Sequence, residues 1–327
     1  MRLRRRRLLA TGLALGVLGF RSPMAQGQTA FPTRGLRIVV PFAAGGVGDL
    51  TARIVATKLG ERLGQPVVIE NRPGAGGVVA AESVARAEPD GYSLFLMSNG
   101  TAVTAGLFKS LPFDTVRDFA PISTLGFFDI AVVAHPDAPF KTFAELLAFA
   151  RAQPGKLNMG SINIGSTQHL AAELFKSSAG IDAQIIPFNG TPNLIGALRG
   201  RQVDVGVEIL APVLAQIRAG ALTALAVAGE RRSPVLPDVP TATEAGVSGF
   251  QASSWNALAA PAKTPRAVIE RLDREIAATV ADAEVQKKLR ELNIDPRSST
   301  PEQTTALLVN DIQRWSRVIE RTGIPRQ

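Results

Sequence analysis

Residues that could act as nucleophiles or bases are scarce in this 327-residue chain. It has two histidines, His135 and His169, and no cysteine. His169 follows Ser166 by three residues at a predicted helix start, so the two side chains could form a hydrogen bond and support nucleophilic catalysis. Because no partner acid and no G-x-S-x-G turn accompany them, the pattern favours helix capping and contact with a bound molecule.

The sequence also has few residue patterns that would bind a metal ion or a nucleotide. Two histidines without a cysteine argue against a transition-metal site, and the carboxylates are scattered without calcium-loop spacing. Residues 74–77 resemble a dinucleotide loop, but Val79 stands where the third glycine belongs, and no glycine loop leads to a Walker lysine. We therefore expect no metal and no cofactor. A glycosidase-type pair of acids stays open, although no spacing points to one.

The strongest chemical pattern is a set of small and hydroxylated residues at predicted helix starts. Residues 36–51, LRIVVPFAAGGVGDLT, read as a strand, a glycine-rich turn and a helix N-terminus. Such N-termini leave backbone N–H groups unpaired and carry partial positive charge, so they attract anions. Four such segments follow predicted strands: Gly45–Asp49, Asn99–Thr101, Gly165–Thr167 and Asn189–Thr191. Each alone resembles an ordinary cap, but four that converge would suit a small carboxylate.

Alternating strand-like and helix-like segments would position these loops. Strands are predicted at 36–40, 67–70, 93–97, 130–134, 157–161, 184–187, 203–208 and 222–227, and helices at 49–63, 78–84 and 165–180 and from 142, 191, 264 and 300. The alternation predicts an α/β fold with a mostly parallel sheet. Two sets, roughly 36–125 and 130–230, predict two lobes, with 231–249 as a surface crossing and the tail on the first lobe. Ligands would then bind between the lobes, at the carboxyl ends of the strands.

The first 27 residues resemble an export signal. Arginines precede an apolar stretch from Leu8 to Phe20, which is too short to span a bilayer, and Ala25-Gln26-Gly27 offers a cleavage site. The arginine run also fits a twin-arginine signal. This segment holds six arginines and no acid, so the remainder keeps 30 basic and 28 acidic residues. Without a basic surface to support it, nucleic-acid binding is not expected.

Six strings of residues, in order along the chain, carry a resemblance to a known family. They are IVVPFAAGGVGD at 38–49, GQPVVIENRPGAGG at 64–77, PDGYSLF at 89–95, GSTQHLAAELF at 165–175, ALAVAGERRSPVLPDVPTATEAGV at 224–247 and SSWNALAAPAKTP at 253–265. Together they resemble the substrate-binding proteins of tripartite tricarboxylate transporters, the Bug family. The resemblance covers essentially the whole chain after the predicted signal.

This resemblance implies a type II periplasmic binding-protein fold, with two α/β lobes joined by a hinge and the ligand cleft between them. It implies a signal peptide at 1–27, a first lobe of 28–127 plus 250–327, and a second lobe of 128–249. The function implied is that of a periplasmic, non-enzymatic and usually monomeric receptor. It would capture a small carboxylate by cleft closure and deliver it to the membrane permease subunits of a tripartite tricarboxylate transporter. A ligand-presenting sensor subunit and, less in keeping with the residues, a periplasmic hydrolase are the alternatives.

The resemblance also implies which residues meet the ligand. The loop Phe42–Asp49 and a facing loop, Ser161–Thr167, would grip a carboxylate, partly through ordered water. Carried over by position, the binding residues are Phe42, Ala43, Ala44, Gly45, Gly46, Asp49, Asn99, Thr101, Ser161, Gly165, Ser166, Thr167, His169, Asn189 and Glu208.

Three positions depart from the family pattern. Gly48 replaces a hydroxyl residue, and Asn189 lies where relatives often have lysine between an aromatic residue and a glycine. Glu208 stands where relatives often have aspartate. Since these positions would tune the far end of the ligand, the substrate is not inherited from the family.

Overall fold

The computed structural model describes residues 31–327, so the predicted signal and its cleavage site lie outside the described residues. In this part of the chain, strands pair in the order β2-β1-β3-β9-β4-β7-β5-β6, and β10 and β8 also pair with β4. The strands are β1 (Leu36–Val40), β2 (Val67–Asn71), β3 (Ser93–Ser98), β4 (Phe119–Ala134), β5 (Leu157–Ile162), β6 (Ala183–Phe188), β7 (Val205–Ile209), β8 (Thr223–Val227), β9 (Ser253–Pro261) and β10 (Ile294–Asp295). The helices are α1 (Val47–Leu63), η1 (Ala75–Gly77), α2 (Val78–Ala85), α3 (Asn99–Leu107), α4 (Phe143–Ala152), α5 (Thr167–Ala179), α6 (Thr191–Arg199), α7 (Leu210–Arg218), α8 (Arg266–Val280), α9 (Ala283–Glu291) and α10 (Pro301–Thr322).

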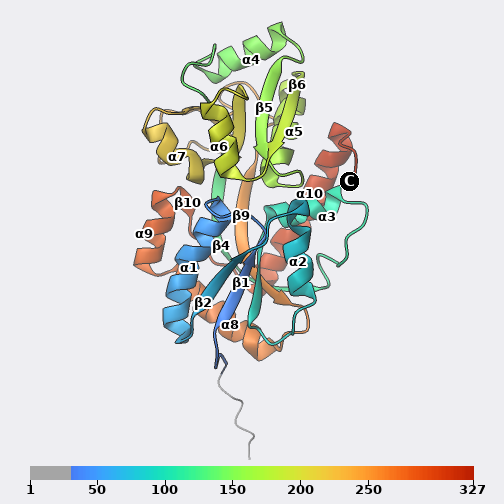
Figure 1. Ribbon diagram of the computed structural model, residues 1–327, viewed down its shortest axis with the longest axis vertical. Coiled ribbons are helices and arrows are strands. Elements are labelled where there is room, and N and C mark those ends of the chain that lie inside the picture. The colour runs from blue at the N-terminus through green and yellow to red at the C-terminus, as the bar shows by residue number, and fades with distance from the viewer. Residues whose placement is uncertain (1–30) are drawn as a thin grey trace, which may run out of the picture. The chain divides into compact units, whose positions relative to one another are not determined.

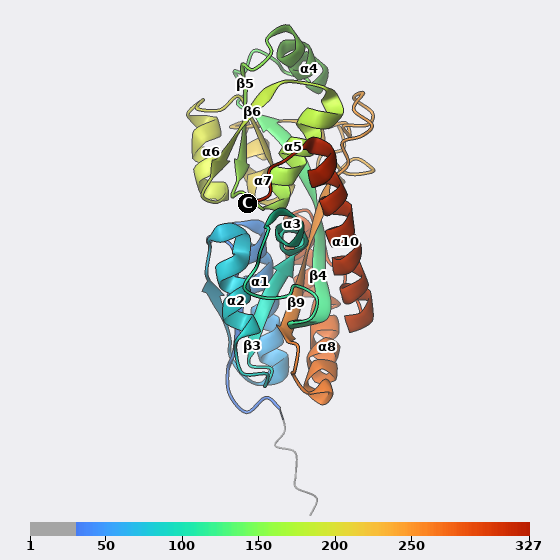
Figure 2. The same cartoon turned by 90° about the vertical axis from the view of Figure 1, so that its right-hand side faces the viewer.

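The long strand β4 runs through both lobes (Figures 1 and 2). Its residues Phe119–Asp129 pair with β9, and its residues Ile130–Ala134 pair with β7 and β8, all antiparallel. The first lobe therefore contains β1, β2, β3, β9, β10 and the beginning of β4, and the second contains β5–β8 and the end of β4. The chain crosses once in β4 and returns through residues 228–252, which lead from β8 into β9.

The first lobe is built on parallel pairing of β1 with β2 and β3. Its inner strands are almost completely buried, as their apolar runs at 38–40 and 94–97 require. The helix α1 packs against α8 and α9, whereas α2 and α3 pack on the β3–β9 side, where α10 covers α3 (Figure 1). The C-terminal helices thus pack on the first lobe, as predicted for the tail.

The second lobe places α5 and the α6–α7 pair around the parallel strands β5, β6 and β7. Apolar residues of α6 and α7, with Leu194 and Val213 among them, form one buried cluster with Ile162 at the end of β5. A second contact joins Phe143 of α4, Phe175 of α5 and Phe250 of the return crossing, with ring centroids 5.3 Å and 5.1 Å apart. Apolar and aromatic packing within the second lobe therefore anchors α6 and the second half of α5.

Several predicted helix starts are confirmed. The helices predicted from 142 and 300 begin with capping boxes, formed by Thr142 and Glu145 at α4 and by Thr300 and Gln303 at α10. The helix predicted from 191 also begins there, with Pro192 as its second residue. The prediction of a mostly parallel sheet was wrong. The strands β4 and β9, which connect the lobes, pair antiparallel to each other. Within the described residues, no helix is long and apolar enough to cross a membrane.

Candidate binding site

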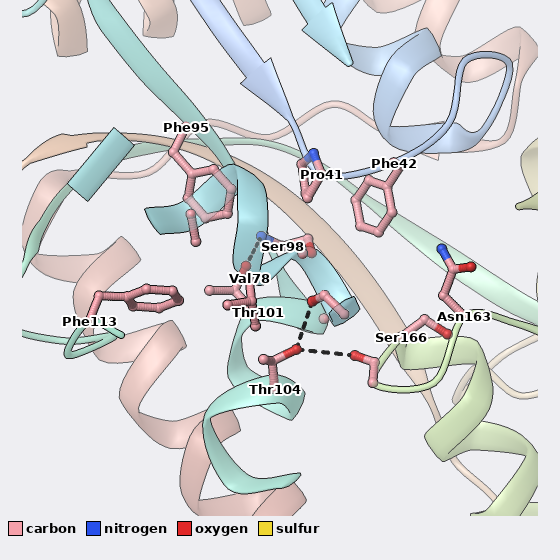
Figure 3. Close-up of a pocket in the computed structure, with 15 residues that line it drawn as sticks. Pro41, Phe42, Val78, Phe95, Ser98, Thr101, Thr104, Phe113, Asn163 and Ser166 are labelled. Carbon is pink, nitrogen blue, oxygen red and sulfur yellow. Dashed lines mark hydrogen bonds between the residues drawn. The ribbon is translucent and has the colours of Figure 1, made fainter. Parts of the chain in front are cut away.

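Two adjoining cavities lie between the lobes, where β1, β3, β5 and β7 end. The central cavity has a volume of about 440 Å³ and the side cavity about 430 Å³, both including space that opens to solvent. Phe42, Ser98 and Asn163 line both cavities, so the two spaces meet at these side chains. Figure 3 shows the three among the residues that line the side cavity.

The N-termini of four helices open onto these cavities. The residues that precede or begin them line one cavity or the other: Gly46 and Val47 of α1, Ser98 of α3, Ser166 and Thr167 of α5, and Gly190 and Thr191 of α6. Among the described residues, none that lines either cavity is charged. Helix dipoles and the N–H groups of the first helical turns, which have no partner within their own helix, therefore favour an anion at this site.

Asp49 fastens the loop between β1 and α1. Its carboxylate accepts hydrogen bonds from the Gly45 N–H at 2.9 Å, from Arg53 Nε at 2.9 Å and from Asn71 Nδ2 at 3.0 Å. Burial acts to raise the pKa of Asp49, but these hydrogen bonds outweigh it and hold the pKa below its ordinary value. Gly45, with φ of 84°, makes the turn that allows this contact. The predicted residues Asp49, Ala44 and Gly45 thus support the loop and line neither cavity.

The absence of a side chain at Gly48 has a local cause. A Cβ atom at Gly48 would lie 2.7 Å from Cδ2 of Phe42 and 3.2 Å from Cδ2 of Leu96. The Phe42 ring therefore packs where a hydroxyl residue would otherwise stand, and it turns one wall of both cavities apolar.

Asn99 and Thr167, two predicted ligand residues, bond to each other across the lobes. The Thr167 hydroxyl donates to Asn99 Oδ1 at 2.9 Å. Asn99 Nδ2 donates to Asp311 Oδ2 at 2.6 Å, and Trp255 Nε1 donates to the same oxygen at 2.6 Å. We call this set of four residues the cross-lobe chain. This chain of hydrogen bonds joins α5 of the second lobe to α3, β9 and α10 of the first.

A second contact between the lobes borders the side cavity. The Thr104 hydroxyl lies 2.8 Å from the Gly76 carbonyl oxygen and 3.4 Å from the Gly165 carbonyl oxygen (Figure 3). Gly165 has φ of 83°, and a Cβ atom there would lie 3.4 Å from the Gly76 Cα. A glycine at 165 therefore allows both the left-handed backbone and the close approach of the facing loop.

Ser166 and His169 do not form the hydrogen bond that a nucleophile and its base would need. The Ser166 hydroxyl donates to the Ile162 carbonyl oxygen at 2.8 Å and accepts from the His169 backbone N–H at 3.1 Å, so it caps α5. The His169 ring is buried away from the cavities, its Nδ1 has no partner in the described chain, and burial lowers its pKa. The helix-capping interpretation of Ser166 is confirmed.

Glu208 lies behind the second-lobe wall of the central cavity. Its Oε1 accepts hydrogen bonds from Gln168 Nε2 at 2.6 Å and from the Ile209 backbone N–H at 2.7 Å, and both donor residues line the cavity. Burial raises the pKa of Glu208 to about 7, although these hydrogen bonds and the Thr191 hydroxyl oppose the rise. The residue thus sits next to the cavity without lining it.

The predicted residues divide into three groups in the structure. Seven line a cavity: Phe42, Ala43, Gly46, Thr101, Gly165, Ser166 and Thr167. Seven support these or lie behind them: Ala44, Gly45, Asp49, Asn99, Ser161, His169 and Glu208. Asn189 is exposed outside both cavities, although Gly190 beside it lines the central one.

Sequence reasoning missed several polar residues of the cavities. Asn256 of β9 lines the central cavity, and its buried Nδ2 has no hydrogen-bond partner in the described chain. The Ser98 Oγ is likewise buried without a partner, and Gln168 and Ser254 complete the polar wall. Asn256 and Ser254 belong to a strand that was not predicted, which is why no pattern pointed to them.

Comparison with known proteins identifies similar sequences and similar structures. A family model described as the tripartite tricarboxylate transporter family receptor matches residues 51–324. Protein BugT of Bordetella pertussis is 35% identical over 320 residues, which cover 97% of this chain and 98% of BugT. The structure of periplasmic binding protein BugD has a TM-score of 0.87 and 32% identity, over 91% of this chain and 100% of that one. The structure of R. palustris Rpa4515 with adipate also has a TM-score of 0.87 and 32% identity, over 90% and 99% of the two chains.

Proposed function

Because the chain belongs to the tripartite tricarboxylate transporter receptor family, we propose that it captures a small carboxylate in the periplasm and delivers it to a tripartite tricarboxylate-type membrane transporter. The family consists of solute-binding receptors, and the expected type II periplasmic binding-protein fold is confirmed. The structure of Rpa4515 with adipate, a dicarboxylate, supports the choice of ligand class.

One observation carries the proposal: four helix N-termini surround cavities whose described lining holds no charged side chain. A carboxylate there would accept hydrogen bonds from backbone N–H groups and from neutral donors such as Asn256 Nδ2. A hydrogen bond to a charged group contributes about 1.5–3 kcal/mol, and burial of the ligand's apolar part contributes more. Binding of this kind needs no covalent step.

Capture would proceed by closure of two lobes. We propose lobe boundaries at 28–127 with 250–327 for the first lobe and 128–249 for the second, with the hinge in the middle of β4 and in the return crossing. The cross-lobe chain and the Thr104–Gly165 contact form only when the lobes meet, so they would add to the stability of the closed form.

Replacement of Thr167 by valine is expected to lower the affinity for a carboxylate ligand about fivefold. Valine keeps the shape of the side chain but removes the hydrogen bond to Asn99, whose net contribution is about 1 kcal/mol to the closed form. Because ligand binds the closed form, a smaller closed population weakens the apparent affinity. Isothermal titration with a ligand from the acid panel described below measures this change.

Thr57→Val is the matched control, since the exposed Thr57 hydroxyl donates only to the Arg53 carbonyl oxygen within α1. The control should keep the wild-type affinity. An unchanged affinity in Thr167→Val would show that the hydrogen bond to Asn99 does not bias closure.

The partners follow from the same proposal. The ligand is a small carboxylate, and the loaded receptor meets the permease subunits of its transporter as a monomer. No nucleic acid and no cofactor take part. Export to the periplasm would use the predicted N-terminal signal at 1–27, with the twin-arginine route as one form of it.

A thermal-shift screen tests the proposed function. The mature chain is unfolded and refolded to remove trapped ligand, and it is then mixed with aliphatic dicarboxylates, tricarboxylates, aromatic acids, acidic amino acids and nicotinate-like acids. A ligand at 100 times its dissociation constant stabilises the folded protein by about 2.7 kcal/mol, which raises the melting temperature by a few degrees. We expect one class of acid to give this shift.

Uncharged analogues of the acids are the control in this screen, because a carboxylate receptor should not bind them. Uncharged amides and alcohols of the same carbon skeletons should leave the melting temperature unchanged. If no acid shifts the melting temperature of correctly folded protein, the carboxylate-receptor proposal is wrong.

A further inference from the structure

Glu208 is a buried acid one residue removed from the central cavity. Its side chain is 0% exposed, and its Oε1 accepts hydrogen bonds from Gln168 Nε2 and from the Ile209 backbone N–H. The Thr191 hydroxyl also acts on the carboxyl group and lowers its pKa, against the effect of burial. Since Gln168 and Ile209 line the central cavity, a ligand that fills this cavity must approach the buried carboxyl group.

The charge of this acid is not compensated. The described lining of the central cavity has no lysine or arginine, and Glu208 forms no ion pair with any described residue. The ionisable side chains on the elements packed against β7 are Asp129 of β4, His169, Glu173 and Lys176 of α5, Arg199 of α6 and Arg218 of α7, and none of them contacts Glu208. A second negative charge beside an ionised Glu208 would therefore be strongly disfavoured.

We propose that Glu208 and Gln168 form the subsite for the far end of the ligand, and that this subsite admits a second carboxylate only together with one proton. The inference rests on the proposed function, because it takes the near carboxylate to be held at the helix N-termini. The proton comes from solvent and is held by Glu208, which stays neutral behind the cavity wall while the far carboxylate occupies the cavity.

The orientation of Gln168 explains what else this subsite accepts. Its Nε2 is committed to Glu208, so its Oε1 is the atom left to face the ligand. A far end that carries an amide or hydroxyl donor can bond to this oxygen and needs no proton. The burial that raises the pKa of Glu208 to about 7 keeps the proton available near neutral pH. Ligand selection would thus depend on pH for diacids and not for their neutral-ended analogues.

Two matched pairs of ligands test the inference: succinate with its monoamide succinamate, and adipate with its monoamide adipamate. Isothermal titration of the refolded mature protein is run from pH 6.5 to 8.5, where the carboxylates of the free ligands are mostly ionised. Two buffers of different ionisation enthalpy count the protons. For the diacid that binds, we expect a loss of affinity of about tenfold from pH 7.5 to 8.5, with uptake of about one proton. Its monoamide should change by less than about twofold and take up none.

Two variants locate the effect. Glu208→Gln removes the group that titrates, so binding of the diacid should lose both its pH dependence and its proton uptake. Glu173→Gln is the matched control, because Glu173 is a half-buried acid of α5 that does not line the cavity, and it should behave like wild type. If Glu208→Gln does not fold, the proton count of the wild-type protein decides alone.

The outcomes separate this inference from the proposed function. Equal affinity for a diacid at pH 6.5 and 8.5, without proton uptake, overturns the inference and leaves the receptor function standing. The same holds if neither pair binds while other acids of the thermal-shift panel do. If no acid binds at all, the proposed function fails and the inference fails with it.

Discussion

Glu208→Gln is expected to be about 3 kcal/mol more stable relative to wild type at pH 8 than at pH 4. Glu208 loses its proton near the ordinary glutamate pKa of 4.5 in the unfolded chain, whereas burial raises its pKa to about 7 in the folded protein. Between these values the folded protein holds more protons than the unfolded chain. The contribution of Glu208 to wild-type stability is therefore complete below pH 4.5, falls as the pH rises, and is lost above about 7. Glutamine has no proton to lose, so the variant escapes this fall.

Urea unfolding of both proteins between pH 4 and pH 8 measures this difference, because the groups that the two proteins share cancel. Glu173→Gln is a useful comparison, since burial also raises the pKa of Glu173 but leaves that side chain only half-buried. Relative to wild type, Glu173→Gln should also gain stability from pH 4 to pH 8, but by a smaller amount. If the stability difference between Glu208→Gln and wild type stays constant over this pH range, folding does not change the pKa of Glu208.

Elements with local sequence patterns were predicted, and those that depend on distant pairing were not. The strand at 36–40 has a β-branched, apolar run, and the helix starts at Thr142 and Thr300 have capping residues three positions apart. The first half of β4 contains Pro121 and Gly126, which usually break a strand. In the structure, the register with β9 shifts beside both residues, so irregular pairing accommodates them.

The strand β9 was missed for a different reason. Its residues Ala257, Ala259 and Ala260 have low preference for strands, but β9 lies between β3 and β4 and is almost completely buried. Burial in the middle of the sheet overrides the preference of the individual residues. Because β9 carries Asn256 and Ser254, the missed strand also hid the polar wall of the central cavity.

The loops of the candidate site were predictable, but the partners of their side chains were not. Glycine and hydroxyl patterns identified the segments around Gly46, Thr101 and Ser166, which do line the cavities. Asn99 instead pairs with Asp311, 212 positions further along the chain, and no local pattern reveals a contact at that separation. A residue of the predicted loop can therefore serve the closure of the lobes while its neighbours line the site.

Asp311→Ala is expected to destabilise the folded protein by about 3–5 kcal/mol. A single oxygen of the buried Asp311 accepts hydrogen bonds from Asn99 Nδ2 and Trp255 Nε1, each at 2.6 Å. Alanine leaves both donors buried without a partner, and each such loss costs about 1–3 kcal/mol. Asp311→Asn keeps an oxygen of similar position, so its cost should be about 1 kcal/mol. Urea unfolding of the two variants measures the difference, and equal stabilities would contradict the assignment.

The same carboxylate should also govern closure, because it fixes the amide that receives the Thr167 hydroxyl. Without Asp311, Asn99 is free to turn, and its Oδ1 no longer has to face Thr167. Thr167→Val should therefore weaken ligand binding about fivefold in the wild-type background and very little in the Asp311→Ala background. The double-mutant cycle of ligand affinities tests this coupling at a temperature where every variant is folded. If the losses of ligand affinity in Thr167→Val and Asp311→Ala are fully additive in the double variant, Asp311 supports the fold of the first lobe without acting on the contact between the lobes.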